Sequence, residues 1–452
     1  MRTPIAVLTV SLLSISFAAA QELPARNADA VARRYFGADW AKTDASAAPA
    51  PSTPRSAPPE ANAEEPLQDH GPLQDDHAKV THMSITRVAY LYYLSRFDGG
   101  ELSKYIGESN GQIPASDTPD NVVAGSFDED GSRNDPWNQL IPELRHFWDC
   151  RKGPFKGLWG YDSSVDRAQK YFTGGYGLKG AYDKGWEQKE TKGHGIVWHY
   201  KNGDKALAYW YLGHAAHLLE DATVPAHVLL YPHPFKNADY YETYMGSHYA
   251  DWEKKIPEGD VDSYATLYDL FYHTANTTND FDAGSGSGLA GADGKKDRGS
   301  RRKGGFTEAK LRQEGDVLMP LAYRSVASIF LYFFQQIDHV PPRVTMVYPA
   351  SKDAGAPQLT ADARVTLKAS AIDDVSGVDR YGYRFEYAVW TGKTWSAWHA
   401  TSAGPTVSSL DFAVEPGRRY EVRVSAVDAA GNRAYSAPGY LSAAVPQRLA
   451  SL

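Results

Sequence analysis

Leu212-Gly-His-Ala-Ala-His217-Leu-Leu-Glu-Asp221-Ala-Thr-Val-Pro225-Ala-His227 is the stretch around which the rest of this chain is organised. The surrounding segment 205–224 is rich in Ala, Leu, Tyr and Trp, and Asp204 precedes it as an N-cap. It contains no proline before Pro225. This composition predicts a helix over 205–224.

Three side chains in this stretch have the spacing of metal ligands. His217 and Asp221 lie four residues apart, which puts an imidazole and a carboxylate on one helical face where both can bind one cation. Pro225 ends or kinks the helix and brings in His227 from a different direction, as a second metal requires. A buried hydrogen bond between His217 and Asp221 is the alternative, and this stretch alone does not decide between the two.

The N-terminus predicts export. Arg2, the apolar segment 5–17 and Ala18-Ala-Ala20 have the layout of a cleavable secretory signal over residues 1–20. No later stretch is expected to be long and apolar enough to span a bilayer. We therefore expect a secreted protein, extracellular or periplasmic. Cys150 is the single cysteine, so no intramolecular disulfide can form.

The charge and the aromatic content narrow the class of partner. A net charge of −8 argues against a general nucleic-acid binder, whose surface is usually basic. It leaves open a nuclease that acts through metals. Aromatic residues make up 12% of the chain, which suits an enzyme that works on sugars, bases or lipid interfaces. We expect a monomer.

Changes in composition predict the domain organisation. Residues 21–68 are rich in Ala and Pro and read as a disordered leader or pro-segment. Residues 69–339 predict an all-α domain, interrupted by a flexible Gly-rich loop at 282–305. Short alternating runs separated by turn residues follow in 340–452 and predict an antiparallel all-β sandwich.

Further candidate ligands occur on both sides of the opening stretch. His82 begins an apolar helical segment that runs to Phe97, Asp130 ends a run of three acids, and His146 lies in an aromatic patch. Each has an ordinary structural interpretation: a satisfied core histidine, a solvated loop acid, or a packed imidazole.

The segment 241–253 predicts another helix after His227. On it His248 and Asp251, three residues apart, share a face and would complete a site with His227. Glu253 and Glu242 are the weaker candidates for this carboxylate.

The combination resembles the zinc-dependent bacterial phospholipases C, an all-helical family with three zinc ions. The residues that carry the resemblance are Thr81-His82, Gly125 with Asp130, His146-Phe-Trp-Asp149, His217-x-x-x-Asp221 and Pro225-x-His227. It covers residues 75–338. A sister branch of the family contains zinc-dependent single-strand nucleases. Residues 340–452 resemble the fibronectin type III-like modules that follow many secreted bacterial enzymes.

The resemblance implies a ligand set for up to three zinc ions. The residues implied to bind the first zinc are Asp130, His146, His217 and Asp221. Asp221 would bridge to a second zinc held by His82, and His227 with His248 would hold the third. The carboxylate of this third site usually comes four residues after the histidine, but Trp252 stands there, so Asp251 is the expected ligand.

A second departure concerns the zinc at His82. In the family the mature chain usually begins with a tryptophan whose amino group and carbonyl ligate this zinc. Nothing between Pro66 and His82 is tryptophan, and Trp40 lies in the leader. Cleavage at another residue, substitution by His77 or Asp76, and a site with fewer zincs all remain open.

The activity implied is that of a phospholipase C, which hydrolyses the phosphodiester of a phospholipid at a membrane surface. Asp130 is the expected general base. One alternative is a nuclease or nucleotidase on the same fold, with a nucleic-acid substrate. Another is a non-catalytic protein in which zinc stabilises the helices while the β-sandwich binds a cell-surface or matrix ligand.

Overall fold

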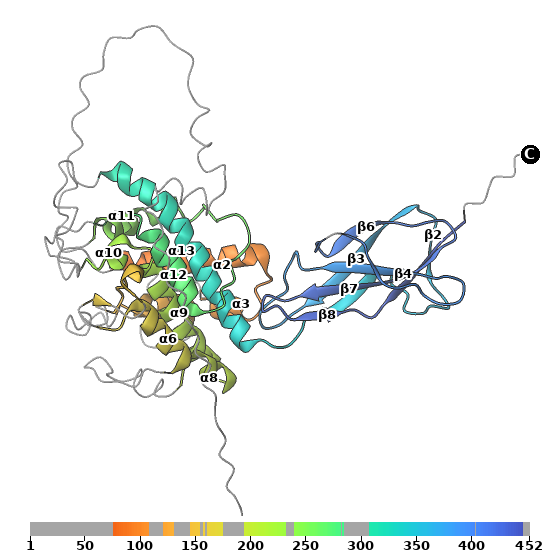
Figure 1. Cartoon of the computed structure of the whole chain (residues 1–452), viewed down its shortest axis with the longest axis horizontal. Helices are drawn as coiled ribbons and strands as arrows, with labels where there is room; N and C mark the ends of the chain where they lie inside the picture. Colours follow the sequence, from red (N-terminus) through yellow and green to blue (C-terminus); the bar gives the residue numbers. More distant parts are fainter. Residues whose placement is uncertain are drawn as a thin grey trace, which may run out of the picture. The chain divides into compact units, whose positions relative to one another are not determined.

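The structure is a computed structural model that divides into a helical part and a β part (Figure 1). It describes residues 76–107, 121–130, 145–153, 157–158, 161–174, 194–231, 239–281, 283, 307–402 and 404–445. Helices run between Asp76 and Ile337 and strands between Arg343 and Ala443. The predicted order, helices first and strands second, is confirmed. The expected signal peptide, the leader 21–68 and loop 282–305 apart from Ala283 lie outside the described residues.

The helical part contains α-helices of very different length. They are α2 (Asp76–Arg96), α3 (Leu102–Tyr105), α4 (Val122–Asp128), α6 (Ser164–Thr173), α8 (Ile196–Lys201), α9 (Lys205–Asp221), α10 (Pro225–Val228), α11 (Tyr240–His248), α12 (Leu267–Thr278) and α13 (Glu308–Ile337). Two 3₁₀ turns, η1 (Cys150–Lys152) and η3 (Tyr249–Asp251), accompany them. The sequence predicted that His82 begins the helix. Helix α2 instead begins six residues earlier, so His82 lies in its second turn.

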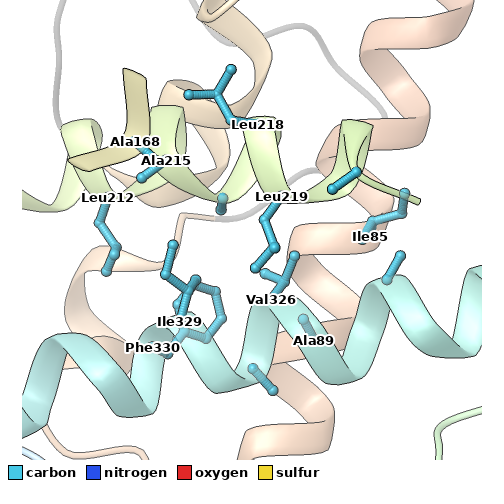
Figure 2. Close-up of a cluster of buried hydrophobic side chains, with 14 of the residues drawn as sticks. Ile85, Ala89, Ala168, Leu212, Ala215, Leu218, Leu219, Val326, Ile329 and Phe330 are labelled. Carbon is cyan, nitrogen blue, oxygen red and sulfur yellow. The ribbon is translucent and has the colours of Figure 1, made fainter. Parts of the chain in front are cut away.

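Helix α9 lies at the centre of the helical part. Its residues are buried from Leu207 to Asp221, as expected of a helix that is apolar on every face. It packs against α2, α4, α6, α8 and α13. Figure 2 shows Leu212 and Leu219 of α9 pointing toward Val326 and Ile329 of α13. The C-terminal end of α9, which carries His217 and Asp221, is therefore fixed by packing against several helices.

Two glycines let α4 and α9 touch backbone to backbone. A Cβ added to Gly125 would lie 1.8 Å from the carbonyl oxygen of Trp210, and one added to Gly213 would lie 2.1 Å from that of Val122. Any larger residue at either position would push the helices apart. This contact brings the C-terminal end of α4, and Asp130 beyond it, to the second half of α9.

Helix α13 continues through Pro320 without interruption. By length and composition it could cross a membrane, contrary to the expectation that no such stretch follows the signal segment. However, 83% of its most apolar window is buried inside the protein. Its apolar residues are covered by α2, α9 and α12, so the helix serves as core.

The β part contains two sheets that share one core. Its strands are β1 (Arg343–Tyr348), β2 (Gln358–Thr360), β3 (Arg364–Ile372), β4 (Arg384–Val389), β5 (His399–Ala400), β6 (Ser409–Ala413), β7 (Arg419–Val427), β8 (Arg433–Tyr435) and β9 (Gly439–Ala443). One sheet has the order β1-β3-β6 and the other β2-β9-β7-β4-β5, with β8 paired to β7. The pairs are antiparallel except β2 with β9, which is parallel and was not predicted. Leu367 and Phe385, from the two sheets, belong to the same buried cluster.

Acidic side chains follow α13 and two strands. Carboxylate oxygens of Asp338, Asp373 and Asp428 lie within 4.8 Å of one another. Asp338 accepts a hydrogen bond from the backbone of Ser376 (3.2 Å), and Asp428 accepts one from Asn432 (2.8 Å). The pKa of Asp428 is raised to about 6 because the side chain is buried and the other two acids lie nearby.

Candidate metal centre

Imidazoles and carboxylates from five segments meet at the end of α9. The residues that meet are His82 of α2, Asp130 after α4, His146 before η1, His217 and Asp221 of α9, and His227 of α10. Every one of these histidines is buried. The structure thus brings together the ligands expected for the first two zinc sites.

Asp221 lies at the centre of the group because its two oxygens face different histidines. Its Oδ2 lies 2.8 Å from His146 Nδ1 and 3.3 Å from His217 Nε2. Its Oδ1 lies 3.7 Å from both His82 Nε2 and His227 Nδ1. One carboxylate between two pairs of nitrogen donors has the arrangement that a bridging ligand requires.

Asp130 completes the side of the group nearest α4. Its Oδ1 lies 3.2 Å from His217 Nε2 and 3.7 Å from His146 Nδ1. The rings of His82 and His217 stack with their centroids 3.9 Å apart. His82, Asp130 and His217 offer donor atoms that all lie within 4.8 Å of one another.

The ligands at the third expected zinc site differ from those predicted from the sequence. His227 Nε2 lies 3.4 Å from Glu242 Oε1, and Asp221, His227 and Glu242 form one cluster of donor atoms. Glu242, the weakest of the predicted alternatives, stands in the first turn of α11. Asp239 caps this helix through its Oδ1, and its Oδ2 is buried without a hydrogen bond.

The structure does not bring His248 and Asp251 to this centre. His248 Nδ1 lies 2.9 Å from the carbonyl oxygen of Tyr244, and its ring stacks on that tyrosine. Asp251 is exposed and pairs with Arg312 at 3.3 Å. The α-helix ends at His248 and η3 follows, so the expected shared helical face does not exist. Glu253 accepts a hydrogen bond from Ser84 (2.8 Å).

Groups behind the histidines fix the direction of their rings. His217 Nδ1 donates to the carbonyl oxygen of Ser126 (2.7 Å), and His82 Nδ1 donates to Glu220 (2.7 Å). The Nε2 atoms are thereby turned toward Asp221. Glu129 lies behind His146, with 3.7 Å between its Oε1 and His146 Nε2.

Glu129 is itself held by several groups. Arg167 pairs with it at 2.6 Å, Tyr171 donates to it at 2.7 Å, and His214 contacts it through Nδ1. Burial opposes the ionisation of Glu129, but Arg167 and then His214 outweigh burial and hold its pKa at about 2. His214 therefore contacts a carboxylate behind the centre and not the donor cluster itself.

The electrostatics of the donor cluster suit bound cations. Burial opposes the ionisation of Asp221, but His217, His227 and His146 outweigh it and hold its pKa well below the ordinary value. Burial lowers the pKa of His227, but Asp221 and Glu242 raise it to about 9. Buried carboxylates and the imidazoles around them are stabilised by metal coordination.

The positions of the donor atoms are also explained better by a bound metal than by hydrogen bonds between the side chains. His217 Nε2 and Asp221 Oδ2 are buried and lie 3.3 Å apart, and the angles of neither atom's contacts are those of a hydrogen bond, although His146 Nδ1 lies only 2.8 Å from Asp221 Oδ2. Zinc prefers this set of imidazole nitrogens and carboxylate oxygens. The side chains of Asp76 and His77, proposed substitutes for the terminal tryptophan, lie outside the described residues.

Three acidic residues beside the predicted ligands were not predicted from the sequence: Glu129, Glu220 and Asp239. The first two each precede a predicted ligand in a Glu-Asp dipeptide, and this repeated dipeptide is the signal that could have found them. Asp239 stands three residues before Glu242, a spacing typical of a helix N-cap.

A pocket lies beside the centre on the side of α11. It is lined by Thr81, His82, Ile85, Glu220, Thr223, Val224, Tyr241, Glu242, Met245 and Met319. Its walls combine apolar side chains with two carboxylates. Phe127 and Trp148 are buried in the helical core, while Phe147 stacks on His227 with centroids 4.5 Å apart.

Comparison with known proteins gives similarity in structure and not in sequence. No family model and no curated protein matches the chain. A crystal structure of Clostridium perfringens alpha-toxin from avian strain SWCP is 10% identical, with a TM-score of 0.33, and the match covers 81% of this chain and 96% of that one. Alpha toxin from Clostridium absonum is 11% identical, with a TM-score of 0.34 and coverage of 79% and 96%. TM-scores this low carry no information about the chemistry of this chain.

Proposed function

We propose that this protein is a secreted, zinc-dependent phosphodiester hydrolase of the phospholipase C type. The observation that supports this most strongly is the position of Asp221, whose two oxygens face His146 and His217 on one side and His82 and His227 on the other. A carboxylate so placed would be a ligand to two neighbouring metal ions, and sites with several metals are typical of phosphodiester hydrolysis.

The donor groups would hold up to three zinc ions. Asp130, His146, His217 and Asp221 offer one set of ligands, and His82 with the second oxygen of Asp221 offers another. His227 and Glu242 would hold the third ion together with Asp221. Zinc, when bound, supplies positive charge for the phosphate and lowers the pKa of water so that hydroxide is available at neutral pH.

Asp130 is the proposed catalytic residue of the chain itself. Its side chain is 20% exposed, whereas that of Asp221 is 1% exposed, so Asp130 is the carboxylate that an incoming water can reach. Burial opposes the ionisation of Asp130, but His217 outweighs burial and lowers its pKa. It is therefore ionised at neutral pH and can accept a hydrogen bond from the attacking water, which orients the water toward phosphorus.

The pocket favours a phospholipid over a nucleic acid. Ile85, Val224, Met245 and Met319 provide apolar walls, which suit the uncharged parts of a lipid. A chain with a net charge of −8 repels a polyanionic strand. In this proposal the β part is fibronectin type III-like and binds a cell-surface or matrix ligand, and the enzyme acts as an exported monomer.

The decisive experiment measures hydrolysis by the zinc-loaded, full-length mature protein. Phosphatidylcholine vesicles and single-stranded DNA are offered side by side, before and after treatment with a chelator and after zinc is restored. We expect release of the phosphorylated head group from the vesicles, its loss with chelator, and its recovery with zinc. Asp221→Asn should abolish this activity while circular dichroism shows the helices intact.

Other outcomes would overturn the proposal in different ways. Release of nucleotides without head-group release would support the nuclease on the same fold. If the zinc-loaded protein hydrolyses neither substrate, the proposed enzyme is refuted and a metal-stabilised binding protein is the better account.

A further inference from the structure

Glu220 is a buried carboxylate outside the expected ligand set that touches one of the proposed ligands. Its side chain is fully buried, and Arg and Lys are absent from its hydrogen bonds among the described residues. It accepts from His82 Nδ1 (2.7 Å) and Ser126 Oγ (3.1 Å) through Oε2, and from Thr86 Oγ1 (2.7 Å) through Oε1. A buried carboxylate is costly without strong partners, so its place here needs a reason.

The hydrogen bond to Glu220 determines which nitrogen of His82 is free. Because a carboxylate only accepts, His82 must carry its proton on Nδ1. The lone pair is then on Nε2, and this atom faces Asp221 Oδ1 at 3.7 Å. Carboxylates that hold the far side of an imidazole in this way orient the ring and make it a better donor to metal.

The same carboxylate is linked to a second proposed ligand. Ser126 donates its hydroxyl to Glu220, and its carbonyl oxygen accepts from His217 Nδ1 at 2.7 Å. The stacked rings of His82 and His217 are thus held from behind by one connected set of hydrogen bonds. Glu220 and Ser126 lie on α9 and α4, the helices joined by the close glycine contact.

We propose that Glu220 is a positioning residue for zinc, which turns His82 Nε2 into the donor cluster and, through Ser126, braces His217. This inference rests on the proposed zinc-dependent function. It assigns to Glu220 a specific effect on zinc affinity that a residue with a purely structural role would not have.

Glu220→Gln and Glu220→Ala separate the two roles. Glutamine keeps the size of the side chain and an accepting oxygen but removes the charge, whereas alanine removes every hydrogen bond. Zinc is the probe, titrated into the metal-free full chain against a chromophoric chelator, and bound ions are counted by native mass spectrometry. We expect Glu220→Ala to weaken the affected site about 10- to 100-fold and Glu220→Gln to weaken it less.

Glu253→Gln is the matched control. Glu253 also accepts a hydrogen bond from α2, through Ser84 at 2.8 Å, but lies outside the donor cluster. This variant should bind zinc with wild-type affinity and number.

The outcomes distinguish this inference from the function on which it rests. If the wild type binds no zinc, the proposed function fails. If the wild type binds zinc and Glu220→Gln binds the same number of ions with the same affinity, while only the melting temperature falls, the positioning role is refuted and Glu220 is structural. The glutamine variant keeps this test valid even if Glu220→Ala does not fold.

Discussion

Asp221 and Glu242 make unequal contributions to the centre, because they face different numbers of donors. Asp221 lies near four histidines, so its loss affects every proposed metal position. Glu242 lies near His227, with 3.4 Å between its Oε1 and His227 Nε2. We therefore expect a graded effect: removal of Glu242 should empty one metal position and leave the others occupied.

Glu242→Gln and His248→Ala test which residue completes the site at His227. We expect Glu242→Gln to lose one zinc ion, with affinity at that position reduced by at least the 10- to 100-fold that loss of an outer partner costs. His248→Ala should retain every ion, because His248 lies outside the group of donor atoms that Asp221, His227 and Glu242 form. Zinc counting by native mass spectrometry checks both. Loss of an ion from His248→Ala alone would restore the ligand predicted from the sequence.

Residues whose role follows from local spacing could be predicted, and residues whose role depends on a helix end could not. His217 and Asp221 are one turn apart, and α9 continues as far as Asp221, so the structure places both on one face as predicted. His248 and Asp251 needed the α-helix to continue past His248, but the chain turns into a 3₁₀ helix there. Tighter winding changes the direction of each later side chain.

The contact between helices α4 and α9 determines where the ligands of the metal centre lie. Ser126 supplies the carbonyl that aligns His217, and Asp130 follows at the end of α4. Both depend on the close approach at Gly125 and Gly213. The sequence shows each glycine, but their partnership is a long-range contact that local patterns do not contain.

Gly213→Ala should therefore impair the centre without altering any of its ligands. The added methyl would lie 2.1 Å from the carbonyl of Val122, so α4 must move away. We expect a loss of about 1 to 3 kcal/mol in the free energy of unfolding, together with weaker zinc binding. Urea denaturation and zinc titration measure the two effects.

A control at an open glycine separates crowding from the substitution itself. Gly404→Ala places its methyl where nothing lies within 4 Å and should be neutral in both assays. Wild-type zinc affinity in Gly213→Ala would show that the approach of the two helices does not set the position of the ligands.

At the scale of the whole molecule, the order of a helical part and a β part could be predicted because hydrophobic periodicity changes along the chain. The acidic group of Asp338, Asp373 and Asp428 could not, since its members come from segments far apart in sequence. Burial and mutual repulsion raise the pKa of Asp428 to about 6, against an ordinary value of 3.8. The folded protein therefore holds this proton more tightly than the unfolded chain does.

This difference makes stability depend on pH in a definite direction. Between about pH 4 and pH 6 the folded state binds more protons at Asp428 than the unfolded state, so its contribution to the free energy of unfolding decreases as pH rises. The contribution is fully present below the unfolded pKa and is lost as pH rises through the folded pKa. Asp428→Asn has no proton to lose and should not show this decrease.

The measurement is urea denaturation of wild type and Asp428→Asn from pH 4 to pH 7. We expect the stability of the variant, relative to wild type, to increase with pH across this window and to level off above it. The difference between the two proteins cancels the titration of the metal ligands, which they share. A difference that is constant from pH 4 to pH 7 would show that Asp428 ionises as readily in the folded protein as in the unfolded chain.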